Sequence, residues 1–185
     1  MELHSENHYR LERWIAVFLA LLFFLPFVAK ADEVALVCNG NTAWLQQAGG
    51  NTPSHAWVLN DARLRTGAVT VAQCNDLPVA TPAKINFNGL ESTLTWRCAP
   101  SDVEGFQQCA LMLGEQVLTW RMALDGQEMK VLVSFAGDLD RDSRLDLLVD
   151  ISRNGREWHP ALFLSSAAKN GQLVAKVAEL RLPGC

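Results

Sequence analysis

Four aspartates crowd into one short segment of the sequence, at Asp138, Asp140, Asp142 and Asp146. Carboxylates this close together repel one another unless a cation lies among them. Calcium in proteins takes about six to eight oxygen ligands. Carboxylates at the first, third, fifth and ninth positions of the segment, with the backbone carbonyl of Arg144 at the seventh, supply much of that shell. The spacing therefore predicts a calcium loop at the tip of a hairpin; the alternative is a solvated acidic turn that holds no metal.

The sequence around the aspartates, residues 136–149, resembles the calcium loop of FG-GAP/VCBS-type repeats, which are found in integrin alpha propellers and many bacterial exported proteins. The resemblance implies five ligand positions, with Arg144 contributing its backbone only: Asp138, Asp140, Asp142, Arg144 and Asp146. It covers about one repeat, whereas a propeller needs at least about four blades. We therefore expect the loop and not the propeller.

Two positions of the loop depart from the pattern of that family. The family usually has glycine at the fourth and sixth positions, where this chain has Arg141 and Ser143. The sixth position tends to need a backbone conformation that glycine tolerates best, so both changes should weaken calcium affinity. The twelfth position, which carries a bidentate glutamate in an EF-hand, is Val149. A loop flanked by strands is therefore expected rather than one flanked by helices.

A second group of residues capable of chemistry consists of Asp150, Glu157 and His159. The predicted strand pairing sets His159 opposite Asp150, and a neighbouring carboxylate can tune a histidine. Such pairs are more often exposed cross-strand ion pairs, and no Gly-x-Ser-x-Gly elbow surrounds Ser165 or Ser166. The leading hypothesis is thus a non-catalytic binding or envelope-interaction module, and a small extracytoplasmic hydrolase is the alternative.

Two tryptophans bear on the hypothesis of a binding module. Trp44 and Trp57 could form a platform for a protein or glycan ligand, or could fill the core. Strand alternation instead assigns the other tryptophans that follow residue 31 to the apolar face of a sheet: Trp96, Trp120 and Trp158.

The cysteines all follow residue 31, and they are Cys38, Cys74, Cys98, Cys109 and Cys185. Antiparallel pairing of residues 93–98 with 107–113 sets Cys98 opposite Cys109, close enough for a disulfide at a non-hydrogen-bonded pair. A second bridge between Cys38 and Cys74 is the further pairing considered, and Cys185 could replace either partner or stay free. Two bridges would fit an oxidising compartment.

Alternating apolar and polar residues from residue 92 onward are typical of half-buried strands. Gly114-Glu115 predicts a two-residue hairpin of type II′, which sets Leu111 opposite Leu118. Because a slip of one residue would reverse the faces of a strand, such turns fix the register.

Asp125-Gly126 and Asn154-Gly155 predict two further hairpins. The first would place Trp120 opposite Val131, and the second would place Leu147 opposite Leu162. The predicted fold is therefore mostly β: an antiparallel meander that forms a sandwich or barrel-like single domain, and not a full propeller.

The N-terminal residues have the three parts of a secretory signal peptide. Arg10 and Arg13 precede an apolar run over residues 14–28, and Ala29-Lys30-Ala31 offers a cleavage site. We expect residues 1–31 to be removed and residues 32–185 to form the mature β-rich domain, periplasmic or secreted. The membrane would then be a partner only through the transient signal peptide; a retained anchor is the alternative.

The charge balance argues against nucleic acid as a partner. The net charge is −4, and no basic strip is present that could follow a phosphate backbone. The partner expected is an unidentified protein or glycan.

Overall fold

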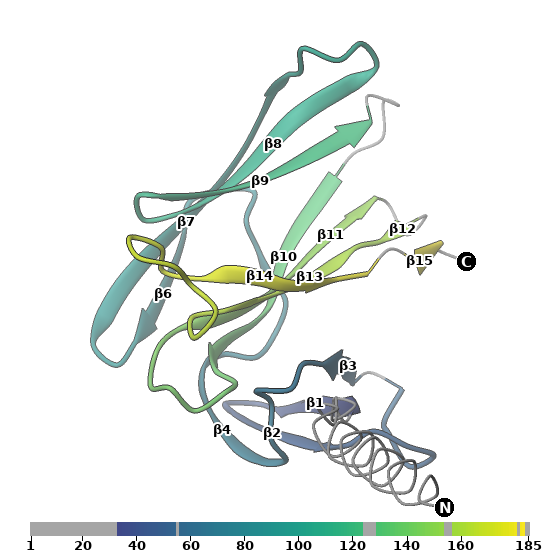
Figure 1. Cartoon of the computed structure of the whole chain (residues 1–185), viewed down its shortest axis with the longest axis vertical. Helices are drawn as coiled ribbons and strands as arrows, with labels where there is room; N and C mark the ends of the chain where they lie inside the picture. The colour runs from purple at the N-terminus through teal and green to yellow at the C-terminus, as the bar shows by residue number, and fades with distance from the viewer. Residues whose placement is uncertain (1–32, 55, 124–128, 154–156, 181, 184–185) are drawn as a thin grey trace, which may run out of the picture. The chain divides into compact units, whose positions relative to one another are not determined.

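In a computed structural model of the protein, every regular element of the described residues is a β-strand, and every strand pairing among them is antiparallel. The structure describes residues 33–183 except 55, 124–128, 154–156 and 181. The strands form two sheets (Figure 1), and one of these sheets is barrel-like and nearly closed. This confirms the prediction of a mostly β, antiparallel fold that is not a full propeller.

Within the described ranges the longer sheet contains eleven strands, of which eight form its main path in the order β14-β13-β11-β10-β4-β2-β1-β3. Those eight are β1 (Glu33–Asn39), β2 (Thr42–Gln47), β3 (Trp57–Asn60), β4 (Gly67–Gln73), β10 (Met129–Asp138), β11 (Asp146–Arg153), β13 (Pro160–Leu164) and β14 (Ala175–Glu179). Three two-residue strands pair beside this path: β5 (Leu77–Pro78), β12 (Glu157–Trp158) and β15 (Leu182–Pro183).

The second sheet is a four-stranded meander. It contains β6 (Ala83–Phe87), β7 (Leu90–Pro100), β8 (Phe106–Leu113) and β9 (Gln116–Ala123), in that order. Leu111 pairs with Leu118, as the turn predicted. Gly114 has a φ of 57°, the positive value that the first central residue of a type II′ turn requires.

The predicted hairpin between β9 and β10 is wrong. Its turn, at Asp125-Gly126, lies outside the described residues, but the flanking strands belong to different sheets. β10 pairs with β11, β4 and β5. Trp120 and Val131 do share one core cluster. The sequence predicted this apolar contact between neighbouring strands of one sheet. In the structure it is made across the core, between two sheets.

The predicted register between β11 and β13 is wrong by one residue. Leu162 pairs with Leu148 and not with Leu147, which pairs with Phe163. The turn at Asn154-Gly155 lies outside the described residues. Both faces of these strands are buried, since Leu147 and Phe163 belong to one core cluster and Leu148 and Leu162 to the other. A slip of one residue therefore exposes no apolar side chain, and alternation could not exclude it.

Two disulfides cross-link residues 31–185, which form one compact unit. Cys98 and Cys109 are paired at the predicted register. Cys38 of β1 is joined to Cys74, which follows β4. Both predicted bridges are thus present, and they are typical of an oxidising, extracytoplasmic environment. Cys185 and the predicted signal peptide, residues 1–31, lie outside the described residues.

The tryptophans differ in burial. Trp120 is buried, with Trp96 against it at a ring-centroid distance of 5.7 Å. Trp57 is half-buried and packs on the second core cluster. Trp44 is also half-buried, but it alternates with the buried Ala43 and so lies on the opposite face of β2. The side chain of Trp158 is not among those described.

No helix in the described part of the chain has the length and apolarity needed to span a bilayer.

Candidate metal centre

The aspartate-rich loop connects two strands at the centre of the longer sheet. β10 ends at Asp138, β11 begins at Asp146, and their ladder closes with the pair Gly137–Asp146. Leu139, the first residue after β10, is fully buried and belongs to the core cluster beneath the loop. The loop is thus flanked by strands, as predicted, and fastened to the core at its first turn.

The two positions that depart from the FG-GAP/VCBS pattern have the backbone conformation favoured by glycine. Arg141 and Ser143 each have a φ of 66°, in the left-handed region that a non-glycine residue enters at a cost of about 1–2 kcal/mol. The guanidinium of Arg141 donates hydrogen bonds to the carbonyls of Thr66 and Arg65, at 2.8 and 3.3 Å. The loop therefore keeps its curvature without the glycines.

Asp138 organises the turn of the loop. Its two carboxylate oxygens accept hydrogen bonds from the backbone N–H groups of Asp142 and Ser143, at 3.0 and 2.9 Å. The tip is also held from outside, because the amide of Asn88 donates to the carbonyl of Ser143 at 3.1 Å.

Asp146 lies at the base of the loop and is fully buried. It accepts hydrogen bonds from the N–H groups of Leu139 and Ser165, at 2.7 and 2.8 Å. Burial raises the pKa of Asp146 to about 6, and the negative charge of Asp140 adds to the rise, although the N–H donors oppose it. The site thus contains a carboxylate that is costly to ionise without a cation nearby.

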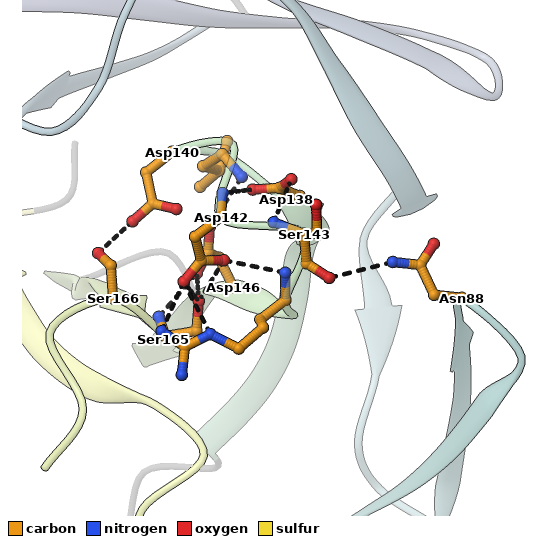
Figure 2. Close-up of polar contacts among 10 residues, drawn as sticks. Asn88, Asp138, Asp140, Asp142, Ser143, Asp146, Ser165 and Ser166 are labelled. Atoms are coloured by element: carbon orange, nitrogen blue, oxygen red, sulfur yellow. Dashed lines mark hydrogen bonds and ion pairs between the residues drawn. The ribbon is translucent and has the colours of Figure 1, made fainter.

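One oxygen of the cluster has no hydrogen-bond donor. Asp140 Oδ2 accepts from the hydroxyl of Ser166, whereas Asp140 Oδ1 is buried and unpaired. Carboxylate oxygens from Asp138, Asp140 and Asp146 lie within 4.8 Å of one another. Figure 2 labels the three side chains at the loop and shows the hydrogen bond between Asp140 and Ser166.

Asp142 is held by neighbouring side chains rather than by that group of three. Arg144 donates to it from its backbone N–H at 2.9 Å and from its guanidinium at 2.9 and 2.7 Å. Burial alone would raise the pKa of Asp142, but hydrogen bonds from Ser165 and Arg144 outweigh it and lower the pKa. Of the five predicted ligand residues, the structure therefore brings three carboxylates together and pairs the other two residues with each other.

Ser165 and Ser166, which follow β13, complete the polar cluster (Figure 2). Ser165 Oγ lies 2.8 and 2.9 Å from the two oxygens of Asp142 and 2.9 Å from Asp146 Oδ1. The hydroxyl of Ser165 has one proton and can donate it to only one of these oxygens. The remaining carboxylate oxygens of Asp142 and Asp146 therefore lie close together without a shared proton. Sequence reasoning considered these serines only as nucleophiles; the register of β13 beside β11 is the signal that would have placed them at the loop.

The second predicted cluster is not an open catalytic arrangement. His159 is fully buried, and its Nε2 contacts the carboxylate of Glu179. Asp150 faces Pro160 in the ladder, contrary to the predicted pairing, and accepts from the backbone N–H of His159 at 3.1 Å. The cause is the one-residue shift of β13. The side chain of Glu157 is not among those described.

Fold and loop together define an antiparallel, disulfide-linked β domain that carries one acidic loop between central strands. Comparisons of the chain with protein-family models, with curated proteins and with solved structures returned no match. The likeness of the loop to FG-GAP/VCBS repeats therefore rests on its own residues and stays a prediction.

Proposed function

We propose that this protein is an exported β module whose loop at residues 138–146 binds one calcium ion, and that it acts by binding a protein or glycan rather than by catalysis. The observation that carries the proposal is the unpaired, buried oxygen of Asp140 beside carboxylate oxygens of Asp138 and Asp146. A buried anionic oxygen without a donor is costly. A calcium ion coordinated by all three carboxylates would remove that cost.

The chemistry of the donors favours calcium over softer metals. The cluster offers carboxylate and hydroxyl oxygens, which suit hard cations. The left-handed residues Arg141 and Ser143 support the comparison with a calcium loop, since they curve the backbone where the related loops use glycine. The Arg144–Asp142 pair would compete with the ion for Asp142, so we expect an affinity that suits the calcium-rich outside of the cell.

Export is supported by two disulfides and by the signal-peptide pattern of the first 31 residues. Outside the cell calcium would stabilise the fold, because an ion that binds only the folded state raises its stability by RT ln(1 + [Ca²⁺]/Kd). At a calcium concentration one hundred times Kd this is about 2.7 kcal/mol.

A binding role is supported over hydrolysis by the burial of the acid–base candidates. His159 and Asp150 are 0% and 5% exposed, so a substrate cannot reach them without rearrangement of the sheet. We nominate the half-buried Trp44, on the face of β2 opposite the second core cluster, as the aromatic contact to a ligand.

Thermal unfolding of the purified, oxidised protein in calcium and in chelator tests the proposal. For a domain of this size about 2.7 kcal/mol corresponds to a rise of roughly 5–10 °C in Tm. Asp140→Ala, which removes both carboxylate oxygens, should abolish the rise, whereas Asp102→Ala, at an exposed aspartate far along the chain from the loop, should retain it. Equal Tm values in calcium and chelator for the unmodified protein would refute the proposed site.

A further inference from the structure

The four-stranded sheet ends in a strand that lacks the usual protection of an edge. The end strands of the two main paths are β3 and β14 in the longer sheet and β6 and β9 in the shorter one (Figure 1). β9 has eight residues, whereas β6 and β14 have five each and β3 has four. Natural edges are protected by shortness, proline, bulges or inward-pointing charges, because unpaired backbone groups recruit other strands.

None of these devices occurs in β9. Its ladder with β8 runs without a register shift, and its sequence contains no proline. Its inward positions are uncharged: Gln116, Leu118, Trp120 and Met122. The strand is therefore regular along its length. At its first residue the side chain of Gln116 hydrogen-bonds to the backbone of Leu173 and Val174, so the part open to a partner strand begins after this residue.

The disulfide in the same sheet shows which backbone groups of β9 face the free edge. Cys98 and Cys109 have a Cα–Cα distance of 4.0 Å, as expected of a non-hydrogen-bonded pair. The backbone groups of Cys109 are then directed at β9, where Cys109 pairs with Trp120. Since the direction alternates along a strand, the N–H and C=O groups of Val117, Thr119 and Arg121 point away from β8.

A small groove separates this edge from β14. A groove of about 200 Å³ is lined by Val117 and Thr119 on one side and by Ala175 and Lys176 of β14 on the other. Val117 is 46% exposed, an apolar side chain at the middle of the outward-facing row. Pairing of another strand here would cover it.

We propose that β9 pairs antiparallel with β9 of a second copy of this chain, so that the protein is a twofold-symmetric dimer with a continuous eight-stranded sheet. In the register that we assign, Val117 faces Thr119 of the second copy, and Arg121 faces Glu115. The twofold axis makes each contact occur twice. This proposal goes beyond the proposed calcium-stabilised module and needs no metal.

The charges of Glu115 and Arg121 favour a second copy of the chain as the partner of β9, in this register. Glu115 and Arg121 are exposed, and within the described residues neither takes part in an ion pair. The antiparallel register brings each against the opposite charge of the other copy. Parallel pairing in register would instead set arginine beside arginine and glutamate beside glutamate, which is unfavourable. The central pair of Val117 with Thr119 joins two β-branched side chains, a residue type that is enriched in strands.

Sedimentation equilibrium of the purified, oxidised protein over a range of concentrations tests the dimer. Arg121→Glu and Glu115→Arg should each weaken dimerisation roughly tenfold, because two ion pairs become two like-charge pairs. The double variant should recover the original dissociation constant within about threefold, since its charges are opposite again. Glu104→Arg, an equal charge change at an exposed residue outside β9, is the matched control and should leave it unchanged.

Thr119→Pro is the second test. It removes an outward-facing N–H that the β8 ladder does not use, which edge strands tolerate, so it should give a folded monomer. A monomer at every concentration up to about 1 mM in the unmodified protein would overturn the proposal. A dimer that is insensitive to both single charge reversals would also overturn it, because the interface would then lie elsewhere.

Discussion

Gly137→Ala tests how the fold holds the acidic loop in place. A Cβ atom at this position would lie 2.2 Å from the carbonyl oxygen of Thr70 and 2.8 Å from the ring of Phe135, where real contacts are not found below 3.0 Å. Phe135 is fully buried and cannot swing away, so β4 must move by about 1 Å to reach ordinary van der Waals contact. That movement strains the pairs that Gly137 and Asp138 make with β4.

The cost follows from these contacts. Overpacking costs about 1–3 kcal/mol, and each of two weakened backbone hydrogen bonds adds about 0.5–1.5 kcal/mol. The total of about 2–6 kcal/mol corresponds to a fall in Tm of roughly 5–20 °C. The assay is thermal unfolding in chelator, with Gly50→Ala as control because nothing lies within 4 Å of its added Cβ. The control substitution Gly50→Ala should change the free energy of unfolding by about 0.5 kcal/mol or less. If the Gly137→Ala protein melts within 2 °C of this control, the close packing of β4 on the base of the loop is refuted.

Three further predictions concern the loop. Ser143→Gly should raise the free energy of unfolding by about 0.5–1 kcal/mol in chelator, because relief of the left-handed conformation exceeds the entropy that glycine loses on folding; urea unfolding checks this, and a loss of stability would contradict it. Arg144→Ala should strengthen calcium binding about threefold to tenfold, since Asp142 loses its competing cation; calorimetry measures this, and weaker binding would count against the competition. Because burial raises the pKa of Asp146 to about 6 from 3.8, the stability gained by its protonation in chelator is complete below about pH 4 and is lost as the pH rises through 6. Calcium requires the ionised carboxylate, so the rise in Tm that it causes should be small at pH 5 and full at pH 7.5, and a rise that is equal at both values would contradict the role of Asp146.

Features that depend on local sequence were predicted correctly. The Gly114-Glu115 turn fixed the register of β8 and β9, and with it the face on which Cys109 lies. The position of the loop between two strands also followed from its sequence, because the aspartates separate two apolar runs.

Features that depend on tertiary packing were not predicted correctly from the sequence. Alternation in a strand says that Trp120 and Val131 are buried, but not whether they meet along one sheet or across the core. For β11 and β13 alternation carried no information, since both faces are buried.

The candidate site divides in the same way. Spacing alone identified the aspartates, whereas the contribution of Ser165 depends on the pairing of β13 with β11. The pairing of Arg144 with Asp142 is a choice of side-chain conformation. It was not predicted, because the sequence suggested only the backbone of Arg144 as a ligand.

The measurement that tests the central claim most directly is isothermal titration calorimetry of the oxidised protein with calcium at pH 7.5. We predict one ion bound per chain, and no binding by Asp140→Ala, because the unpaired oxygen of Asp140 completes the group formed with Asp138 and Asp146. Absence of binding by the unmodified protein at millimolar calcium, or equal binding by Asp140→Ala, would contradict the account.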